Sequence, residues 1–163
     1  MTTKTRATAA LAVVAAIAAA TAIPALTGAQ TIDGRQITVR MKVTSGTPVQ
    51  HGKKGETLAT GDSVLVRLKM TSPTGTALGT AYSECVNVGA RAKGEQATLQ
   101  CTQTYKFKDG QIVTTGVVKF SQLKNLAIPI VGGSGAYRGA RGQLTDGVPV
   151  RGFDSVDILH LDN

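Results

Sequence analysis

The chain has 163 residues, a formal net charge of +8 at pH 7, and no tryptophan. Aromatic residues make up only 4% of it, so it offers few rings on which nucleic-acid bases could stack, and we expect no nucleic-acid partner. The length suits one domain with a single hydrophobic core.

The N-terminal segment is expected to be a signal peptide that is cleaved after Ala29. Lys4 and Arg6 precede an uncharged apolar run from Ala7 to Ala20, and small residues stand at the expected cleavage site before Gln30. The run is short for a membrane-spanning helix, and a retained anchor is the lesser alternative. We therefore expect a secreted or extracytoplasmic protein with no stable membrane insertion after cleavage.

Residues 30–163 are expected to form one all-β domain, because apolar and polar residues alternate along most of them. Turn signals such as Ser72-Pro73-Thr74-Gly75 and Lys108-Asp109-Gly110 separate the alternating runs. No stretch has a convincing helical period. The pattern predicts eight strands: Ile37–Val43, Val64–Met70, Ala77–Val88, Leu99–Phe107, Gln111–Phe120, Asn125–Val131, Ala136–Leu144 and Ser155–Leu161.

The basic residues are spread along the predicted strands instead of forming one run. Removal of Lys4 and Arg6 with the signal peptide leaves 16 basic residues against 10 acidic ones, a net charge of +6. Pairs of cations alternate with apolar residues, which is typical of a solvated strand face. These pairs are Arg40 with Lys42, Arg67 with Lys69, and Lys106 with Lys108.

A long polar segment, Ser45 to Gly61, follows the first predicted strand. Connections of this length in a compact domain often serve a function. We expect either a flap over the mouth of a barrel or a plain surface loop.

The two cysteines are expected to form a disulfide. Cys85 and Cys101 each lie eight residues from Lys93, so a symmetric hairpin brings them face to face on adjacent strands. An exported protein meets an oxidising compartment, which favours this bond. We expect no metal site, because His51 and His160 lie far from the cysteines in the sequence.

Five glycines occur between Gly132 and Gly142, directly after an apolar run. The spacing is too long for the dinucleotide-binding fingerprint, the segment lacks the Lys-Ser/Thr ending of a phosphate loop, and no helix pattern follows. The glycines therefore predict a turn at Gly132-Gly133 and a kinked strand, with Tyr137 covering the glycine backbone.

This segment resembles the allene oxide cyclase and dirigent proteins. The resemblance rests on LAIPIVGGSGAYRGARGQL (residues 126–144) and on the upstream turn and strand FKDGQI (residues 107–112). Eight short antiparallel strands fit either a closed barrel or a sandwich, and the resemblance implies the eight-stranded antiparallel β-barrel with an apolar lumen. Family members are often dimers or trimers, so a homo-oligomer stays open.

A barrel of this kind is expected to bind an apolar small molecule. Alternation predicts the lining residues Met41, Val66, Leu68, Met70, Asn87, Leu99 and Phe107. Gln103 and Tyr105 are the predicted catalytic residues, because their polar groups would orient the ligand where charge develops. The glutamate and asparagine of the plant cyclases have no counterpart in Ile37–Val43, and we find no match for the dirigent aspartates.

The resemblance implies a cyclase that steers the ring closure of a polyene-, fatty-acid- or polyketide-derived molecule. Since a purely conformational mechanism needs shape more than titratable groups, we expect no cofactor. Two alternatives remain open. One is a secreted barrel that binds or carries an apolar molecule without catalysis, and the other is a cell-surface protein that uses its basic exterior.

Overall fold

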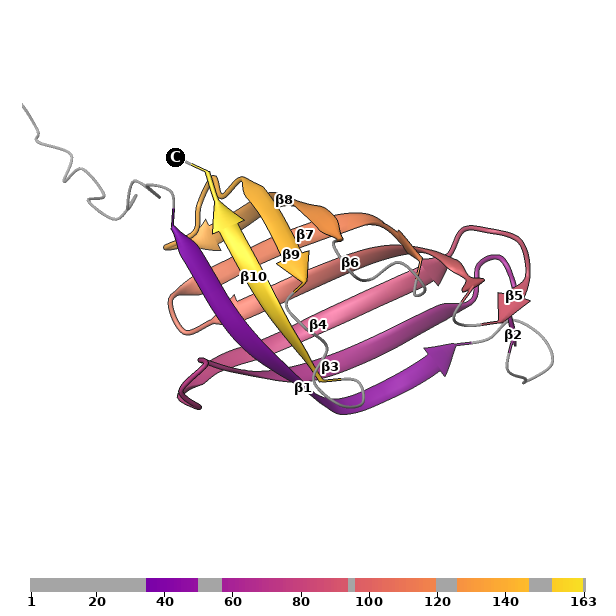
Figure 1. Cartoon of the computed structure of the whole chain (residues 1–163), viewed down its shortest axis with the longest axis horizontal. Coiled ribbons are helices and arrows are strands. Elements are labelled where there is room, and N and C mark those ends of the chain that lie inside the picture. The colour runs from indigo at the N-terminus through magenta and orange to yellow at the C-terminus, as the bar shows by residue number, and fades with distance from the viewer. Residues whose placement is uncertain (1–34, 50–56, 94–95, 120–125, 147–153, 163) are drawn as a thin grey trace, which may run out of the picture.

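The computed structural model describes residues 35–49, 57–93, 96–119, 126–146 and 154–162. Eight antiparallel strands close into a barrel in the order β1-β10-β9-β8-β7-β6-β4-β3, with two further short strands, β2 and β5, beside it (Figure 1). The all-β barrel expected from the sequence is therefore confirmed, whereas the proposed signal peptide lies outside the described residues.

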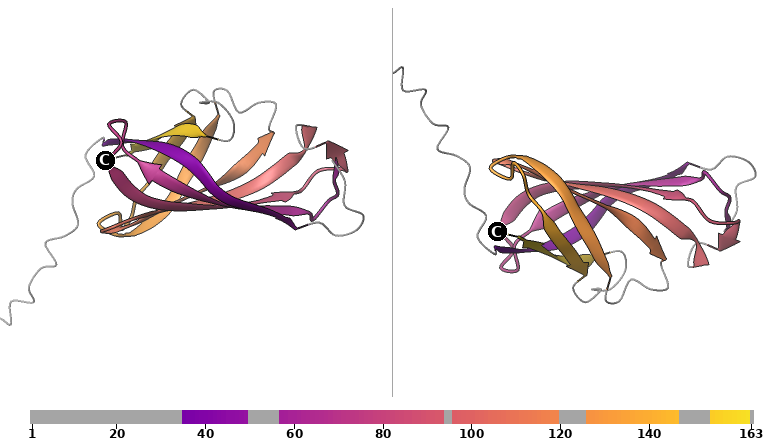
Figure 2. Two further views of the ribbon diagram at one scale, coloured as in Figure 1. Left: turned by 90° about the horizontal axis from the view of Figure 1, so that it is seen from below. Right: turned by 90° about the horizontal axis from the view of Figure 1, so that it is seen from above.

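The strand bounds follow the alternating runs of the sequence. The barrel strands are β1 (Gln36–Val49), β3 (Ser63–Thr71), β4 (Ala77–Asn87), β6 (Thr98–Phe107), β7 (Gly110–Lys119), β8 (Ala127–Gly135), β9 (Gly142–Asp146) and β10 (Ser155–Leu161). The two short strands are β2 (Thr57–Leu58) and β5 (Ala92–Lys93), which pair with each other. Two views at right angles to the first show how the strands wrap around the barrel (Figure 2).

Alternation sorts the side chains of each strand between the lumen and the outer face. On β3, for example, Leu68 and Met70 are buried, whereas Arg67 and Lys69 are exposed. The buried residues of β1, β6 and β10 have the same two-residue period. The apolar interior predicted from the sequence is thus a consequence of strand geometry.

The first strand is longer than expected. Ser45–Val49 continues β1 beyond an irregularity between Val43 and Ser45 and pairs with Ser63–Arg67 of β3. Because a bulge shifts the register by one residue, the strand bends there without ending. The prediction of a long connection from Ser45 to Gly61 is therefore wrong at its start, and residues 50–56 lie outside the described ones.

The glycine-rich segment differs from its prediction in one respect. Gly132 and Gly133 lie within β8, which runs on to Gly135, and the turn comes at residues 136–141 before β9. The prediction of one strand over Ala136–Leu144 is therefore wrong in its first half. A Cβ atom on Gly133 would collide with backbone oxygens of Tyr137 and Gln111, so glycine lets the turn fold back onto the strand.

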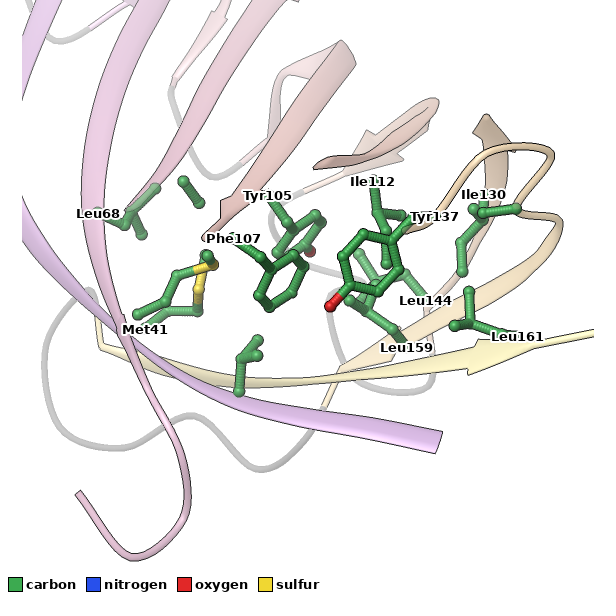
Figure 3. Close-up of a cluster of buried hydrophobic side chains, with 14 residues drawn as sticks. Met41, Leu68, Tyr105, Phe107, Ile112, Ile130, Tyr137, Leu144, Leu159 and Leu161 are labelled. Atoms are coloured by element: carbon green, nitrogen blue, oxygen red, sulfur yellow. The ribbon is translucent and has the colours of Figure 1, made fainter. Parts of the chain in front are cut away.

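Tyr137, in the turn between β8 and β9, packs into the apolar core of the barrel. Its ring lies 5.0 Å, centroid to centroid, from that of Phe107, and both side chains are buried (Figure 3). Burial raises the pKa of the Tyr137 hydroxyl, the nearby Asp109 carboxylate adds to this effect, and Arg35 opposes it. The hydroxyl therefore stays neutral at ordinary pH and can serve as part of the core.

Replacing Gly139 with valine is expected to lower the free energy of unfolding by about 1–3 kcal/mol. Gly139 has a φ of +79°, and nothing lies within 4 Å of the point where a Cβ atom would stand, so the cost arises from the backbone and not from a collision. Urea unfolding would measure it. Gly132→Val is the matched control, since its Cβ would meet only Arg141 Nη1 at 3.9 Å. Equal midpoints for Gly139→Val and wild type would contradict this explanation.

The cysteine prediction is confirmed. Cys85 and Cys101 lie directly opposite each other on β4 and β6 and form a disulfide with an S–S distance of 2.07 Å. This bond is compatible with an extracytoplasmic location. In the part of the chain that the structure describes, no helix has the length and apolar character needed to span a membrane.

Candidate functional site

Both predicted catalytic side chains face the lumen from β6. Tyr105 has no exposed surface and Gln103 is half-buried, and their spacing of two residues puts them on the same side of the strand as Cys101 and Phe107. The two residues therefore lie one above the other on a single wall of the barrel.

The opposite wall supplies a carboxylate. Asp157 on β10 is only 4% exposed, and its Oδ2 accepts hydrogen bonds from the Tyr105 hydroxyl at 2.7 Å and from Gln103 Nε2 at 3.0 Å. Its Oδ1 accepts a hydrogen bond from the Ser155 hydroxyl at 3.1 Å. In the closed order of eight strands, β6 and β10 are four places apart in either direction, so the hydrogen bonds from β6 cross the lumen.

The donors around Asp157 match an ionised carboxylate. Tyr105, Gln103 and Ser155 each direct a hydrogen atom at its oxygens, and a carboxylate without a proton can only accept such bonds. A charge-assisted hydrogen bond between a phenol and a carboxylate can also carry a proton from one to the other. The arrangement therefore places a carboxylate and a phenol within hydrogen-bonding distance of each other in an apolar interior.

Sequence reasoning missed Asp157, although a signal was present. Asp157 lies two residues before Leu159 and four before Leu161 on a strand whose burial alternates. The pattern therefore already places it on the buried face. A single carboxylate at a buried strand position is expensive unless donors surround it. Two of the three donors come from β6, more than 50 residues away in the sequence, and the sequence does not reveal that contact.

The lumen beyond Tyr105 is filled with side chains. Four of the residues predicted to bind substrate, Met41, Leu68, Met70 and Phe107, lie in one buried cluster with Tyr105 and Tyr137. Figure 3 shows the side chains of Met41, Leu68 and Phe107 converging from different strands. They form a packed floor beneath the polar cluster of Asp157, Tyr105 and Gln103.

The other side of the polar cluster is less tightly enclosed. Gln103 and Ser83 face each other on adjacent strands, and both are half-buried, as are Val66 and the disulfide cysteines. Leu99 is fully buried in a second apolar cluster with Leu58, Ala97 and Val118. The side chains between the polar cluster and the disulfide are therefore less buried than those of Met41, Leu68 and Met70.

Asn87 is fully buried, and its side chain forms hydrogen bonds with the backbone of neighbouring loop and strand residues. Its Nδ2 donates to the backbone oxygens of Leu58 at 3.0 Å and Ala90 at 3.3 Å, and its Oδ1 accepts from the Gly89 amide at 3.2 Å. These contacts link the end of β4 to the small β2–β5 sheet. We therefore leave Asn87 out of the proposed ligand site.

A hollow of about 390 Å³ lies on the outer face of the barrel and not in the lumen. Its lining comes mainly from outward-facing residues of β1, β3, β4 and β6, among them Ser45, Arg67, Tyr82 and Thr104.

No group of three or more histidine, cysteine, aspartate or glutamate residues among the described ones could hold a metal ion.

Comparisons with known proteins agree with this architecture. Residues 37–149 match the family described as "Allene oxide cyclase barrel like domain". No curated protein sequence matches the chain significantly.

Similar solved structures share the fold at low sequence identity. A pyocyanin demethylase is 21% identical, with a TM-score of 0.65 over 78% of this chain and 99% of its own. The pterocarpan synthase dirigent protein GePTS1 is 19% identical, with a TM-score of 0.59 over 79% and 88%. AbnU, an exo-specific intermolecular Diels-Alderase, is 15% identical, with a TM-score of 0.57 over 78% and 98%.

Proposed function

The chain belongs to the allene oxide cyclase barrel-like family, and from this premise we propose that it is a cyclase acting on an apolar small molecule. The observation that carries the proposal is the Asp157 carboxylate, which accepts hydrogen bonds from Tyr105 and Gln103 across the lumen. Two of the similar solved structures have names that record a pterocarpan synthase dirigent protein and a Diels-Alderase, and their shared fold supports the proposal.

The polar cluster supports a balanced ring closure by proton transfer. Asp157 takes the proton from a substrate hydroxyl, and the freed oxygen attacks an epoxide carbon of the same molecule. The epoxide C–O bond breaks as its oxygen receives the proton of Tyr105, and Asp157 returns its proton to Tyr105 through their 2.7 Å hydrogen bond. The product is an isomer of the substrate, so the chain's own residues suffice.

Binding supplies the rest of the rate acceleration. The apolar floor formed by Met41, Leu68, Met70 and Phe107 excludes water below the cluster, and the half-buried side holds the flexible part of the ligand near Val66. Holding the two reacting ends together removes much of the entropic barrier to ring formation. Gln103 orients the carboxylate through its amide.

Replacing Tyr105 with phenylalanine is expected to slow cyclisation by about a hundredfold, since the substrate oxygen loses its acid. The probe is a linear C18 hydroxy-epoxide fatty acid, and ring formation is followed by chromatography against a buffer blank. A Tyr82→Phe variant is the control, because Tyr82 lies on the outer face of β4.

Three outcomes decide the proposal. Ring formation by wild type above the blank, lost in Tyr105→Phe and kept in Tyr82→Phe, supports it. Binding of the probe without turnover would favour the carrier alternative. Equal turnover by wild type and Tyr105→Phe would remove Tyr105 from the chemistry.

A further inference from the structure

Five cations gather on the outer face of neighbouring strands. Strand alternation directs Arg40 and Lys42 outward from β1, Arg67 and Lys69 outward from β3, and Lys106 outward from β6, and all five are exposed. They are far apart in the sequence, but β1, β3, β4 and β6 are successive neighbours in the barrel (Figure 1). We call these five residues the basic patch.

The strand register brings like charges together. Lys42 lies directly opposite Lys69, and Lys69 is followed across β4 by Thr80 and then by Lys106. Directly opposed Cβ atoms are about 5 Å apart, and one intervening strand separates Lys69 from Lys106 by about 10 Å. Like charges in this arrangement repel each other, and a bound anion would reduce this repulsion.

The protein itself provides little compensation. None of the five cations forms a salt bridge with a described residue, and the Arg67 guanidinium lies over the Tyr82 ring, 5.9 Å from its centroid. Two carboxylates lie near the patch: Glu84 on the outer face of β4, and Asp109 at the turn after β6. The patch therefore keeps an excess of positive charge that is open to a ligand.

The outer hollow lies beside the basic patch and shares Arg67 with it. Hydroxyl groups of Ser45, Thr47, Thr102 and Thr104 line this hollow of about 390 Å³, together with the half-exposed Tyr82 ring and the Glu84 carboxylate. Hydroxyls, an aromatic face and a carboxylate are the groups that bind the hydroxyls and apolar faces of sugar rings.

We propose that the basic patch and the adjoining hollow bind an anionic glycan. The lysines and arginines neutralise its acidic groups, while Tyr82, Glu84 and the hydroxyls contact its sugar rings. A nucleic acid fits less well, because Tyr82 is the one aromatic ring in the lining and successive bases have no further ring on which to stack. A lipid bilayer fits less well because the surface is hollowed and lined with hydroxyls.

The test measures binding of a fluorescent heparin octasaccharide to the purified protein by anisotropy at low ionic strength. The double variant Lys42→Gln/Lys69→Gln is expected to bind about tenfold more weakly, because two charge-assisted contacts are lost. The matched control is Lys119→Gln/Arg138→Gln, which removes the same charge from exposed positions on other parts of the barrel. Its affinity should change by less than about threefold.

Further measurements separate the glycan from other anions. Tyr82→Ala should weaken octasaccharide binding by about fivefold, because a sugar ring loses its aromatic contact. Single-stranded DNA of similar charge and phosphatidylglycerol vesicles should bind more weakly than the octasaccharide. Equal losses in both double variants, tighter binding of DNA or vesicles, or no octasaccharide binding by wild type would each overturn the proposal.

A thermal unfolding measurement tests whether the Lys42→Gln/Lys69→Gln variant loses binding because it misfolds. Because Lys42 and Lys69 repel each other, their replacement by glutamine should leave the melting temperature unchanged or raise it. A fall in the melting temperature with lost binding would instead show that the two lysines support the fold, and would overturn their assignment to a ligand.

Discussion

Asp157→Asn is expected to reduce ring closure by about a hundredfold or more, the largest effect on activity that the structure predicts. The carboxylate is the only base that the proposed reaction uses, and asparagine cannot accept the substrate proton. Its amide nitrogen also presents hydrogens to Tyr105, Gln103 or Ser155, which are themselves donors to Asp157. Turnover of the hydroxy-epoxide probe by purified variant and wild type measures the effect.

The loss of Asp157 also affects stability, so the test needs a second readout. A buried donor left without its acceptor costs about 1–3 kcal/mol, and urea unfolding will record this part. Probe binding by the folded variant separates the two contributions: a lost base leaves affinity largely intact while turnover falls. Asp162→Asn, the same change at an exposed position just after β10, is the matched control. Full turnover by Asp157→Asn would exclude the carboxylate as the base.

Replacing both cysteines with alanine is expected to lower the free energy of unfolding by about 3 kcal/mol, the largest predicted effect on stability. The Cys85–Cys101 bond closes a loop with a sequence separation of 16 residues, and without it the unfolded chain gains conformational entropy. The corresponding fall in melting temperature is about 10 °C. Urea and thermal unfolding of the double variant and of wild type measure both quantities.

Chemical reduction provides the control for the cysteine variant. Wild type treated with a thiol reductant should lose about the same stability, whereas the double variant should not respond to the reductant at all. If reduced wild type unfolds at the same urea concentration as the oxidised protein, the bond contributes nothing to stability and the loop-entropy explanation fails.

The Cys85–Cys101 pairing and the lumen-facing pair Gln103 and Tyr105 are accessible from the sequence, because they depend on local rules. Successive side chains of a strand point to opposite faces, whichever strands it pairs with. The symmetric hairpin around Lys93 likewise sets Cys85 against Cys101, and the structure confirms the bond. The role proposed for Tyr105 in catalysis stays a prediction.

Two sequence predictions were wrong because the local sequence was compatible both with a turn or loop and with a strand. Gly132-Gly133 is a turn signal by composition, yet both residues lie in β8, where Gly133 lets Tyr137 approach the strand. Ser45–Val49 is polar enough for a loop, yet it pairs with β3 once a bulge has shifted its register. In both cases pairing with a distant strand supplied hydrogen bonds that outweighed the local preference.

The sequence by itself determined that this chain forms strands, which side chains point inward, and that its two cysteines meet, since each depends on short-range periodicity. Only the tertiary structure decided that Asp157 faces Tyr105 across the lumen and that Lys42 lies beside Lys69. Both contacts depend on which strands become neighbours and in which register they pair when the barrel closes. Closure is a property of all eight strands together, and no single segment encodes it.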